Sequence, residues 1–412
     1  MASGRVPKMQ RMRTGVKRES SPAPGTKMKI LMETASCVVY LLAGGFIFYS
    51  LVGYPLLLHF LARWRPKPVH GDSRPRTVTV LLPVHNGETW LRQKLESILE
   101  LDYPRDLLHV LVISDGSTDS TESVAVAFAS ANVELLCIPK VGKAQALNRG
   151  LEKARGEILF FTDVRQRLEP DCLRKMVSCF ADPNVGGVCG ELIILDGETR
   201  EEASVGLYWK LEKWIRRQLS AMGTLLVVTG CLYAMRRELA EPLPAGALGD
   251  DIFMPQSILR KGYRVVFEEG ARAYDYPTAA DVEFGRKIRT LAGLYQYIGR
   301  HGLGPHPFHF FSYKITRLLL PYALLAVALT SFFLPAPFAR ISLLAQILFY
   351  GLAALDPWIP EGSAAKRVTS PARTFCMMML ASVMAISIWF VPAADLWKPT
   401  QVRAPKTGTD QA

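Results

Sequence analysis

The sequence predicts an α/β domain, built on a mainly parallel sheet, with membrane-spanning helices on either side of it. Two patterns predict this fold class. Long uncharged apolar stretches lie near both ends of the 412-residue chain, and short apolar strands alternate with helical segments between them. Such alternation is typical of a parallel sheet with helices on both faces. Ligands bind these sheets beyond the carboxyl ends of the strands, and we therefore expect the chemistry there.

Three apolar stretches reach the roughly 20 residues that a spanning helix needs, namely 34–62, 318–339 and 374–394. The first is too long for a secretory signal peptide and is predicted to be an anchor. A shorter stretch, 341–355, either spans with Trp358 at the interface or packs as a buried or re-entrant helix. The predicted organisation is a basic, disordered tail (1–33), the anchor (34–62), a soluble domain (75–304), a bundle of about three helices (316–395) and a tail (396–412).

The net charge of +12 arises mainly from basic residues in the first 30 positions and in 260–317. No interleaved basic and aromatic motif of the RNA-binding type is present, so we expect no nucleic-acid partner. A basic surface next to membrane lipids, or a site for anionic phosphates, explains the charge better. The basic tail favours a cytoplasmic N-terminus, whereas the basic loop 356–373 favours the opposite orientation. We expect a multi-pass protein of the inner membrane with a cytoplasmic catalytic domain, which leaves the tail unexplained.

The seven cysteines are odd in number and none forms a Cys-x-x-Cys pair. This spacing argues against a disulfide framework and against a cysteine metal cage. It is typical of a protein whose soluble part lies in a reducing compartment.

Apolar runs at 77–82, 110–114, 157–162 and 225–228 are predicted strands, and two of them end in a carboxylate. Asp115 follows the second run and Asp163 follows the third. A single strand-end Asp is equally well explained as a helix cap. Two of them on parallel strands of one sheet indicate a site for a hard cation, which prefers oxygen ligands.

Five motifs in this order resemble those of glycosyltransferase family 2, over roughly residues 75 to 300. They are Pro-Val-His-Asn (83–86), Asp-Gly-Ser-Thr-Asp (115–119), Gly-Lys-Ala-Gln-Ala-Leu-Asn (142–148), Asp-Val-Arg (163–165) and Gly-Asp-Asp (249–251) with the Arg-Lys-Gly-Tyr-Arg segment (260–264) behind it. The resemblance implies a GT-A fold and the inverting transfer of a sugar from a nucleotide donor. The membrane segments resemble those of polysaccharide synthases such as the cellulose and poly-N-acetylglucosamine enzymes.

The resemblance implies a donor site at the first four motifs. The residues that would line a uridine pocket are Pro83, Val84, His85, Asn86 and Asp115, which makes a UDP-sugar the expected donor. Lys143 would neutralise donor phosphate, or else be a solvated lysine at a helix start. Asp163 would bind Mg²⁺ or Mn²⁺. The family's Asp-x-Asp ends here in Arg165, a residue able to clamp a phosphate itself, so metal dependence is expected to be weaker or absent.

On the acceptor side, the resemblance implies that Asp251 is the catalytic base, and that Asp250 either can replace it as the base or supports it. A helix cap is the alternative for this pair. Thr229, Gly230 and Cys231 would meet the acceptor, or form an ordinary turn after the predicted strand 225–228.

Arg289 lies where processive synthases carry a Gln-x-x-Arg-Trp motif that closes over the donor diphosphate. This chain has Arg289 without the Gln and the Trp, which argues against processive polymerisation. Arg289 either keeps the phosphate contact or belongs to a basic rim against anionic lipid headgroups.

The expected function is therefore a membrane-bound inverting glycosyltransferase that acts on a growing polysaccharide or a lipid-linked acceptor. Its expected partners are a UDP-sugar, the acceptor, membrane lipids and other polysaccharide-synthesis subunits. The alternative is a non-catalytic nucleotide- or glycan-binding membrane subunit, which only the altered motif at 163–165 favours. Lys143, Asp163 and Asp251 together favour the enzyme, because a binding protein has no need of a base.

Overall fold

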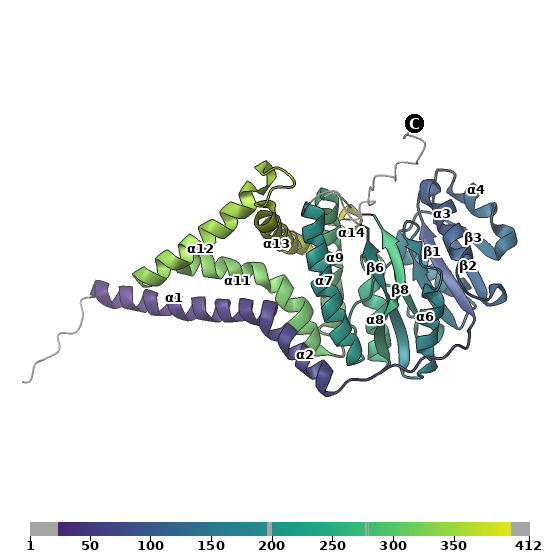
Figure 1. Cartoon of the computed structure of the whole chain (residues 1–412), viewed down its shortest axis with the longest axis horizontal. Coiled ribbons are helices and arrows are strands. Elements are labelled where there is room, and N and C mark those ends of the chain that lie inside the picture. Colours follow the sequence, from purple (N-terminus) through teal and green to yellow (C-terminus); the bar gives the residue numbers. More distant parts are fainter. Residues whose placement is uncertain (1–23, 196–199, 277, 279, 397–412) are drawn as a thin grey trace, which may run out of the picture.

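A computed structural model describes residues 24–195, 200–276, 278 and 280–396. Figure 1 shows the strands gathered on one side of the molecule and α1, α11 and α12 extending away from them on the other. Among the described residues, eight strands form one sheet in the order β3-β2-β1-β4-β7-β6-β8-β5. Their bounds are β1 Val78–Val84, β2 Leu108–Asp115, β3 Val133–Ile138, β4 Ile158–Thr162, β5 Arg167–Leu168, β6 Val185–Ile194, β7 Leu232–Arg236 and β8 Arg264–Asp275.

The first half of the sheet is parallel, since β1 pairs in parallel with β2 and β4, and β2 pairs in parallel with β3. Strand β7 runs antiparallel to both β4 and β6, and β6 pairs in parallel with β8. The prediction of an α/β domain with a mainly parallel sheet and long apolar helices is confirmed. The carboxyl ends of β1, β2 and β4 consequently lie side by side along one edge of the sheet.

Helices cover both faces of the sheet because β1, β2 and β4 carry apolar side chains in both directions. Leu81 and Ile113 pack on one face with Leu147 of α5 (Lys143–Lys153). Val80 and Val112 pack on the other face, beneath α3 (Glu88–Leu99) and α6 (Cys172–Ser178). The remaining α-helices among the described residues of the domain are α4 Thr121–Val126, α7 Arg200–Ala221, α8 Asp250–Arg260 and α9 Ala280–His301.

The predicted strand at 225–228 is wrong. Leu225 to Val228 form no strand, because their pairing with β8 is limited to a single bridge between Thr224 and Val265 and does not continue as a ladder. The backbone amide of Val228 donates to the carbonyl of Asp251 at 3.0 Å, and the side-chain amide of Gln256 donates from Nε2 to the carbonyl of Leu226 at 2.9 Å. The regular strand begins only at Leu232, so this segment fastens α8 to the sheet instead of extending the sheet.

Four helical segments of the described chain are long and apolar enough to cross a membrane: Lys27–Trp64, Pro307–Ser331, Ala336–Trp358 and Lys366–Trp389. The α-helices that form these segments are α1 Pro24–Phe48, which begins three residues before the first segment, α2 Tyr54–Trp64, α10 Pro307–Phe310, α11 Thr316–Ser331, α12 Ala336–Leu355 and α13 Lys366–Met384, and the short α14 Ala393–Leu396 follows. Helix α1 starts at Pro24, so 24–33 is helical where the sequence predicts part of a disordered tail. The predicted tails outside 24–396 lie beyond the described residues.

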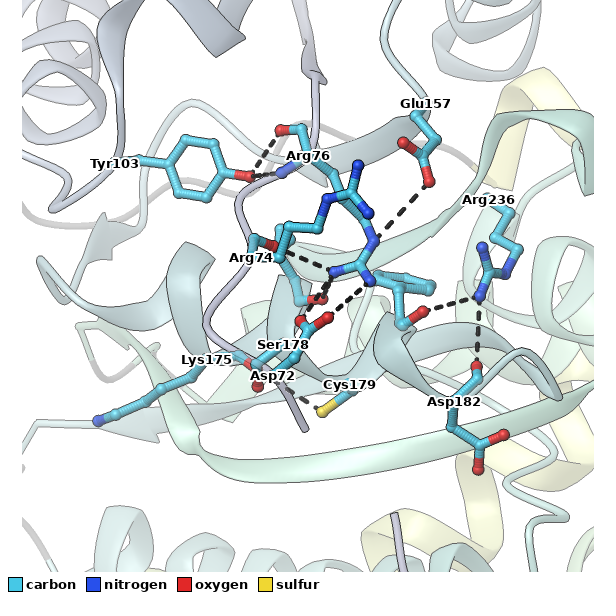
Figure 2. Close-up of polar contacts among 12 residues, drawn as sticks. Asp72, Arg74, Arg76, Tyr103, Glu157, Lys175, Ser178, Cys179, Asp182 and Arg236 are labelled. Carbon is cyan, nitrogen blue, oxygen red and sulfur yellow. Dashed lines mark hydrogen bonds and ion pairs between the residues drawn. The ribbon is translucent and has the colours of Figure 1, made fainter. Parts of the chain in front are cut away.

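The segment between α2 and β1 is fastened to the amino-terminal edge of the sheet (Figure 2). Arg76 forks onto Asp72 at 3.1 and 3.2 Å and reaches Glu157, just before β4, at 3.8 Å. The hydroxyl of Tyr103 donates to the carbonyl of Arg76 at 2.6 Å and accepts from its amide at 2.8 Å. These contacts hold the connection to the anchor at the edge opposite the candidate site.

Candidate active site

The turns that follow β1 and β2 brace one another. His85 donates from Nδ1 to the carbonyl of Asp115 at 2.8 Å, and the side-chain oxygen of Asn86 accepts from the amide of Thr118 at 2.8 Å. Gly116 has φ +61°, and a Cβ there would lie 2.7 Å from the amide nitrogen of Lys140. The turn can therefore close only with glycine. Pro83 and Val84 belong to β1 itself, where Val84 is buried.

Asp115 is buried at the end of β2, and its carboxylate accepts hydrogen bonds from the loop before α5. The amides of Val141 and Gly142 donate to it at 2.7 and 2.9 Å. A carboxylate has about four lone-pair sites, so these bonds leave capacity for a further donor such as a base N–H. Asp115 thus shapes the loop that delivers Lys143, a task that sequence reasoning did not assign to it.

Lys143 joins the two candidate carboxylate positions. Its ammonium lies 2.9 Å from Oδ1 of Asp163, at the end of β4, and 3.1 Å from Oδ1 of Asp250, at the start of α8. The partial burial of Asp163 opposes its charge, but the ammonium of Lys143 outweighs this effect and holds the pKa of Asp163 below its usual range. Despite burial, the two carboxylates raise the pKa of Lys143 above its ordinary value. The hydroxyl of Tyr233, on β7, donates to Oδ2 of Asp250 at 2.9 Å.

Asp251 follows Asp250 in the first turn of α8, and the two carboxylates have different surroundings. Asp250 contacts Lys143 and Tyr233, whereas the side chain of Asp251 lies beside Gly230. A Cβ on Gly230 would lie 3.5 Å from the Cβ of Asp251, an ordinary contact distance, so the two residues are direct neighbours. Burial and the neighbouring charge of Asp250 raise the pKa of Asp251 to about 6.

Of the three residues predicted to meet the acceptor, Thr229 and Cys231 are buried and Gly230 is half-buried. The Thr229 hydroxyl accepts from the guanidinium of Arg216 at 2.5 Å, and its amide donates to the sulfur of Cys189 at 3.1 Å. Burial raises the pKa of the Cys231 thiol, which argues against a reactive thiolate. Among the three, Gly230 is the residue next to Asp251.

Arg165 forms a fork with Asp275 at the end of β8. Its Nε and Nη2 lie 2.8 and 2.5 Å from the two carboxylate oxygens, and Gln166 donates to the same carboxylate at 2.8 Å. The guanidinium that the sequence suggests for a donor phosphate is thus engaged with a carboxylate. Asp275 is 110 positions away in the chain and was not singled out in the sequence.

Lys94 is a second residue that sequence reasoning missed. It is 2% exposed, and its ammonium donates to the hydroxyl of Thr162 and the carbonyl of Gln166, both at 2.7 Å. Burial lowers its pKa to about 8. Its position three residues after Leu91, on the apolar face of α3, is the signal that indicates burial.

Helix α9 brings Arg289 to the same region. Burial and the nearby Arg286 lower the pKa of Arg289, while the charges of Asp163, Asp251 and Asp250 act in the opposite direction. Arg289, which the sequence predicts to contact the donor phosphate, therefore lies within electrostatic range of the carboxylates on both the donor and the acceptor sides.

A divalent cation fits this site through one carboxylate. Among the described residues, no group of three or more His, Cys, Asp or Glu side chains converges as a metal cage. Asp163 offers oxygen ligands, 39% of its side chain is exposed, and the neighbouring Arg165 is committed to Asp275. Mg²⁺ in proteins is commonly held by one or two carboxylates together with substrate phosphates and water, so Asp163 with a donor diphosphate would suffice.

Comparison with known proteins places the chain in a family. The model of "Glycosyl transferase family 2" matches residues 79–243, and that of "Glycosyl transferase family group 2" matches residues 163–394. The second match covers more than half of the chain. The chain therefore belongs to glycosyltransferase family 2, a family of enzymes, and has a GT-A fold.

Among its relatives, the chain is 25% identical to the probable glycosyltransferase YdaM of Bacillus subtilis, over 63% of either chain. It is 26% identical to an N-acetylglucosaminyltransferase of Azorhizobium caulinodans over 50% of this chain and 56% of that protein. A poly-beta-1,6-N-acetyl-D-glucosamine synthase of Staphylococcus epidermidis matches at 26% over 37% and 36%. The chain thus spans less than two thirds of the length of these relatives.

Among solved structures, the chain is similar to the mannosyltransferase PcManGT from Pyrobaculum calidifontis, a complex with GDP-Man and Mn²⁺. The TM-score is 0.65 at 25% identity, and the similarity covers 87% of this chain and 99% of that one. The likeness extends beyond the sheet domain, because that domain alone is much shorter than 87% of the chain.

Proposed function

We propose that the chain is an inverting glycosyltransferase that moves a sugar from a UDP-sugar to a hydroxyl of a membrane-associated glycan or lipid-linked acceptor. The observation that carries the proposal is the pair of carboxylates at the start of α8. Asp250 is tied to Lys143 and through it to Asp163, while Asp251 lies beside Gly230 with a pKa of about 6. A donor-side cluster and a candidate base are thus adjacent.

In the proposed reaction, the acceptor oxygen attacks the anomeric carbon on the face opposite the diphosphate. The acceptor proton passes to Asp251, and the bond from the anomeric carbon to the diphosphate oxygen breaks. The electron pair of that bond leaves with the nucleoside diphosphate. A carboxylate with a pKa of about 6 is ionised at neutral pH and is a stronger base than an ordinary aspartate, which favours this role.

On the donor side, Asp115 and the 83–86 segment would line the base pocket, and Lys143 and Arg289 would face the diphosphate. Asp163 would hold Mg²⁺ or Mn²⁺, and such an ion would neutralise charge on the leaving diphosphate. Because the Lys143 ammonium is 2.9 Å from Asp163, the donor phosphates must draw Lys143 away or share it. We propose that the donor and the metal bind together for this reason.

The four long apolar helices support a multi-pass protein, and we propose that its catalytic domain faces the cytoplasm, where nucleotide sugars are made. Polysaccharide synthesis is the proposed setting, because relatives include a poly-beta-1,6-N-acetyl-D-glucosamine synthase. One observation favours the alternative of a non-catalytic binding subunit: the fork between Arg165 and Asp275 occupies the position of the second metal carboxylate.

The test is nucleoside diphosphate release from UDP- and GDP-sugars by membranes that contain the wild type or Asp251→Asn, with and without Mg²⁺ or Mn²⁺. We expect the wild type to release nucleoside diphosphate from one of the donors and Asp251→Asn to release none. Binding of UDP without release from any donor, over a panel of glycan and lipid acceptors, would favour the non-catalytic alternative. Equal release by the two proteins would remove Asp251 from the mechanism.

A further inference from the structure

Tyr233 carries a buried hydroxyl at a position where the packing requires only an aromatic ring. It lies on β7, is 2% exposed, and its ring is stacked on that of Phe161 of β4, with 4.3 Å between the centroids and 5° between the planes. The two residues are also direct partners in the antiparallel pairing of β4 with β7. Phenylalanine would fill the same space. The hydroxyl therefore needs an explanation of its own, because burying a hydroxyl is unfavourable unless it is hydrogen-bonded.

The hydroxyl of Tyr233 is hydrogen-bonded to Asp250. It donates to Oδ2 at 2.9 Å, while the ammonium of Lys143 lies 3.1 Å from Oδ1. Each oxygen of the Asp250 carboxylate is thus held by a different group. Burial and the charge of Asp250 raise the pKa of Tyr233 well above its ordinary value, so the phenol stays protonated and acts as the donor.

These contacts form a closed ring that begins and ends on β4. Phe161 of β4 stacks on Tyr233, which donates to Asp250 at the start of α8. Lys143 of α5 then joins Asp250 to Asp163, the residue that directly follows β4. The carboxylate of Asp250 is therefore fixed to the sheet from two sides, by a neutral hydroxyl and by an ammonium.

The two partners of Asp250 differ in how they respond to a donor. In the proposed function Lys143 faces the donor diphosphate, whose oxygens compete with Asp250 for the ammonium. Tyr233 is neutral and its ring is held by Phe161, so its hydrogen bond stays in place when Lys143 moves. Tyr233 then keeps the Asp250 carboxylate directed at the sheet.

The direction of the Asp250 carboxylate matters because Asp251 is its neighbour in the chain. The side chain of Asp251 lies beside Gly230, whereas that of Asp250 is directed at Tyr233 and Lys143. A carboxylate released by both partners could turn towards the acceptor side and place a second negative charge beside Asp251. Two like charges there would repel one another and compete for the acceptor hydroxyl.

We propose that Tyr233 is a positioning residue for the transfer reaction. Its hydroxyl holds the Asp250 carboxylate against the sheet while Lys143 engages the donor, and so leaves Asp251 to face the acceptor hydroxyl. In this role Tyr233 contacts neither substrate and acts through Asp250. The inference rests on the proposed function and deepens it, because it separates the tasks of the two adjacent carboxylates.

The test compares Tyr233→Phe with Tyr103→Phe in nucleoside diphosphate release by membranes that contain the full-length protein. Both variants remove the hydroxyl of a buried tyrosine, and Tyr103 bonds to Arg76 at the edge of the sheet opposite the site. We expect Tyr233→Phe to lower kcat about tenfold and to change the UDP dissociation constant by less than about twofold. Tyr103→Phe should leave both quantities unchanged.

Asp250→Ala determines whether the hydroxyl acts through Asp250. In this background Tyr233→Phe should cause no further loss of kcat, because the two changes remove the same interaction. Losses that add would mean that the hydroxyl supports the fold by another route, and would overturn the inference. UDP binding in the same samples reports whether each variant remains folded. If Asp250→Ala binds no UDP, the pair of tyrosine variants decides by itself.

Three results of the tyrosine comparison contradict the inference. Turnover by Tyr233→Phe equal to that of the wild type would overturn it and leave the proposed function in place. Equal losses in Tyr233→Phe and Tyr103→Phe would reduce Tyr233 to a structural contact. A wild type that releases nucleoside diphosphate from no donor would refute the proposed function and, with it, any role of Tyr233 in the reaction.

Discussion

The donor edge and the acceptor edge of the site are built in different ways. On the donor edge, Asp115 and Asn86 accept hydrogen bonds from backbone amides of neighbouring turns, so strand register places them. On the acceptor edge, Glu212 and Arg216 of α7 contact side chains of the membrane segment and of the 229 turn. The donor edge should therefore persist wherever the sheet folds, while the acceptor edge depends on how the helices dock.

The two edges also differ in charge. Lys143 and its two carboxylates form a compact group in which one more negative than positive charge is present. On the acceptor edge, by contrast, Arg216, Lys314 and Arg317 lie 3.9, 3.7 and 2.7 Å from the single carboxylate of Glu212. Lys143 links Asp163 to Asp250, whereas Asp251 lies outside this link, so the two edges are expected to act separately at Asp251. Four experiments test how far the two edges depend on each other.

Asp251→Asn should lower turnover about 10²-fold or more, because the acceptor loses its base. The UDP dissociation constant should stay unchanged, since the donor edge is held by other groups. Steady-state kinetics and UDP titration on one preparation check both. Glu241→Gln, a surface carboxylate that pairs with Arg260, is the matched control. Weaker UDP binding in Asp251→Asn would show that the two edges are not separable.

Lys143→Met should lower the free energy of unfolding of the sheet domain by about 2 kcal/mol, because Asp163 and Asp250 lose their shared cation. This expected loss of stability is smaller than the loss for a fully buried ion pair, since the Lys143 side chain is 30% exposed. Thermal or denaturant unfolding measures it. The exposed Lys140, near the same loop, offers the control Lys140→Met with a change within about 0.5 kcal/mol. Equal effects of the two variants would contradict the bridging role.

The pH dependence of kcat/KM should show an acid limb with a midpoint near pH 6, falling about tenfold per pH unit below it. The base must be ionised, so activity is lost as pH falls through the raised pKa of Asp251. The same shift has the opposite effect on stability. Since the folded state binds this proton more tightly than the unfolded chain, protonation of Asp251 stabilises the fold as pH falls towards 4. A flat profile between pH 5 and 8 would exclude Asp251 as the base.

Asp115→Asn should weaken UDP binding only about fivefold, corresponding to about 1 kcal/mol. The amide keeps one oxygen for the backbone donors of Val141 and Gly142, so the loop before α5 retains most of its shape. Calorimetric titration with UDP gives the change. An effect above a hundredfold would mean that the carboxylate charge itself, and not the loop geometry, controls the donor edge.

The donor edge is also the part of the site that sequence reasoning reached. The runs that end at Asp115 and Asp163 are strands, and both residues lie at carboxyl ends, because alternation and strand ends are local patterns. Whether these residues hold a nucleotide and a metal stays a prediction. The predicted strand at 225–228 failed because a buried apolar run has the same composition whether or not it pairs.

Local sequence patterns predicted the fold class, the long apolar helices and the strand-end carboxylates, all of which depend on neighbours within a few residues. The pairing of charged side chains, in contrast, depends on how distant segments pack. Arg165 pairs with Asp275 across 110 positions, and Glu212 meets Arg317 across 105. The residues next to a charged side chain in the sequence do not indicate its partner. The partner can be any oppositely charged or hydrogen-bonding group that the packing of the helices and the sheet brings within reach.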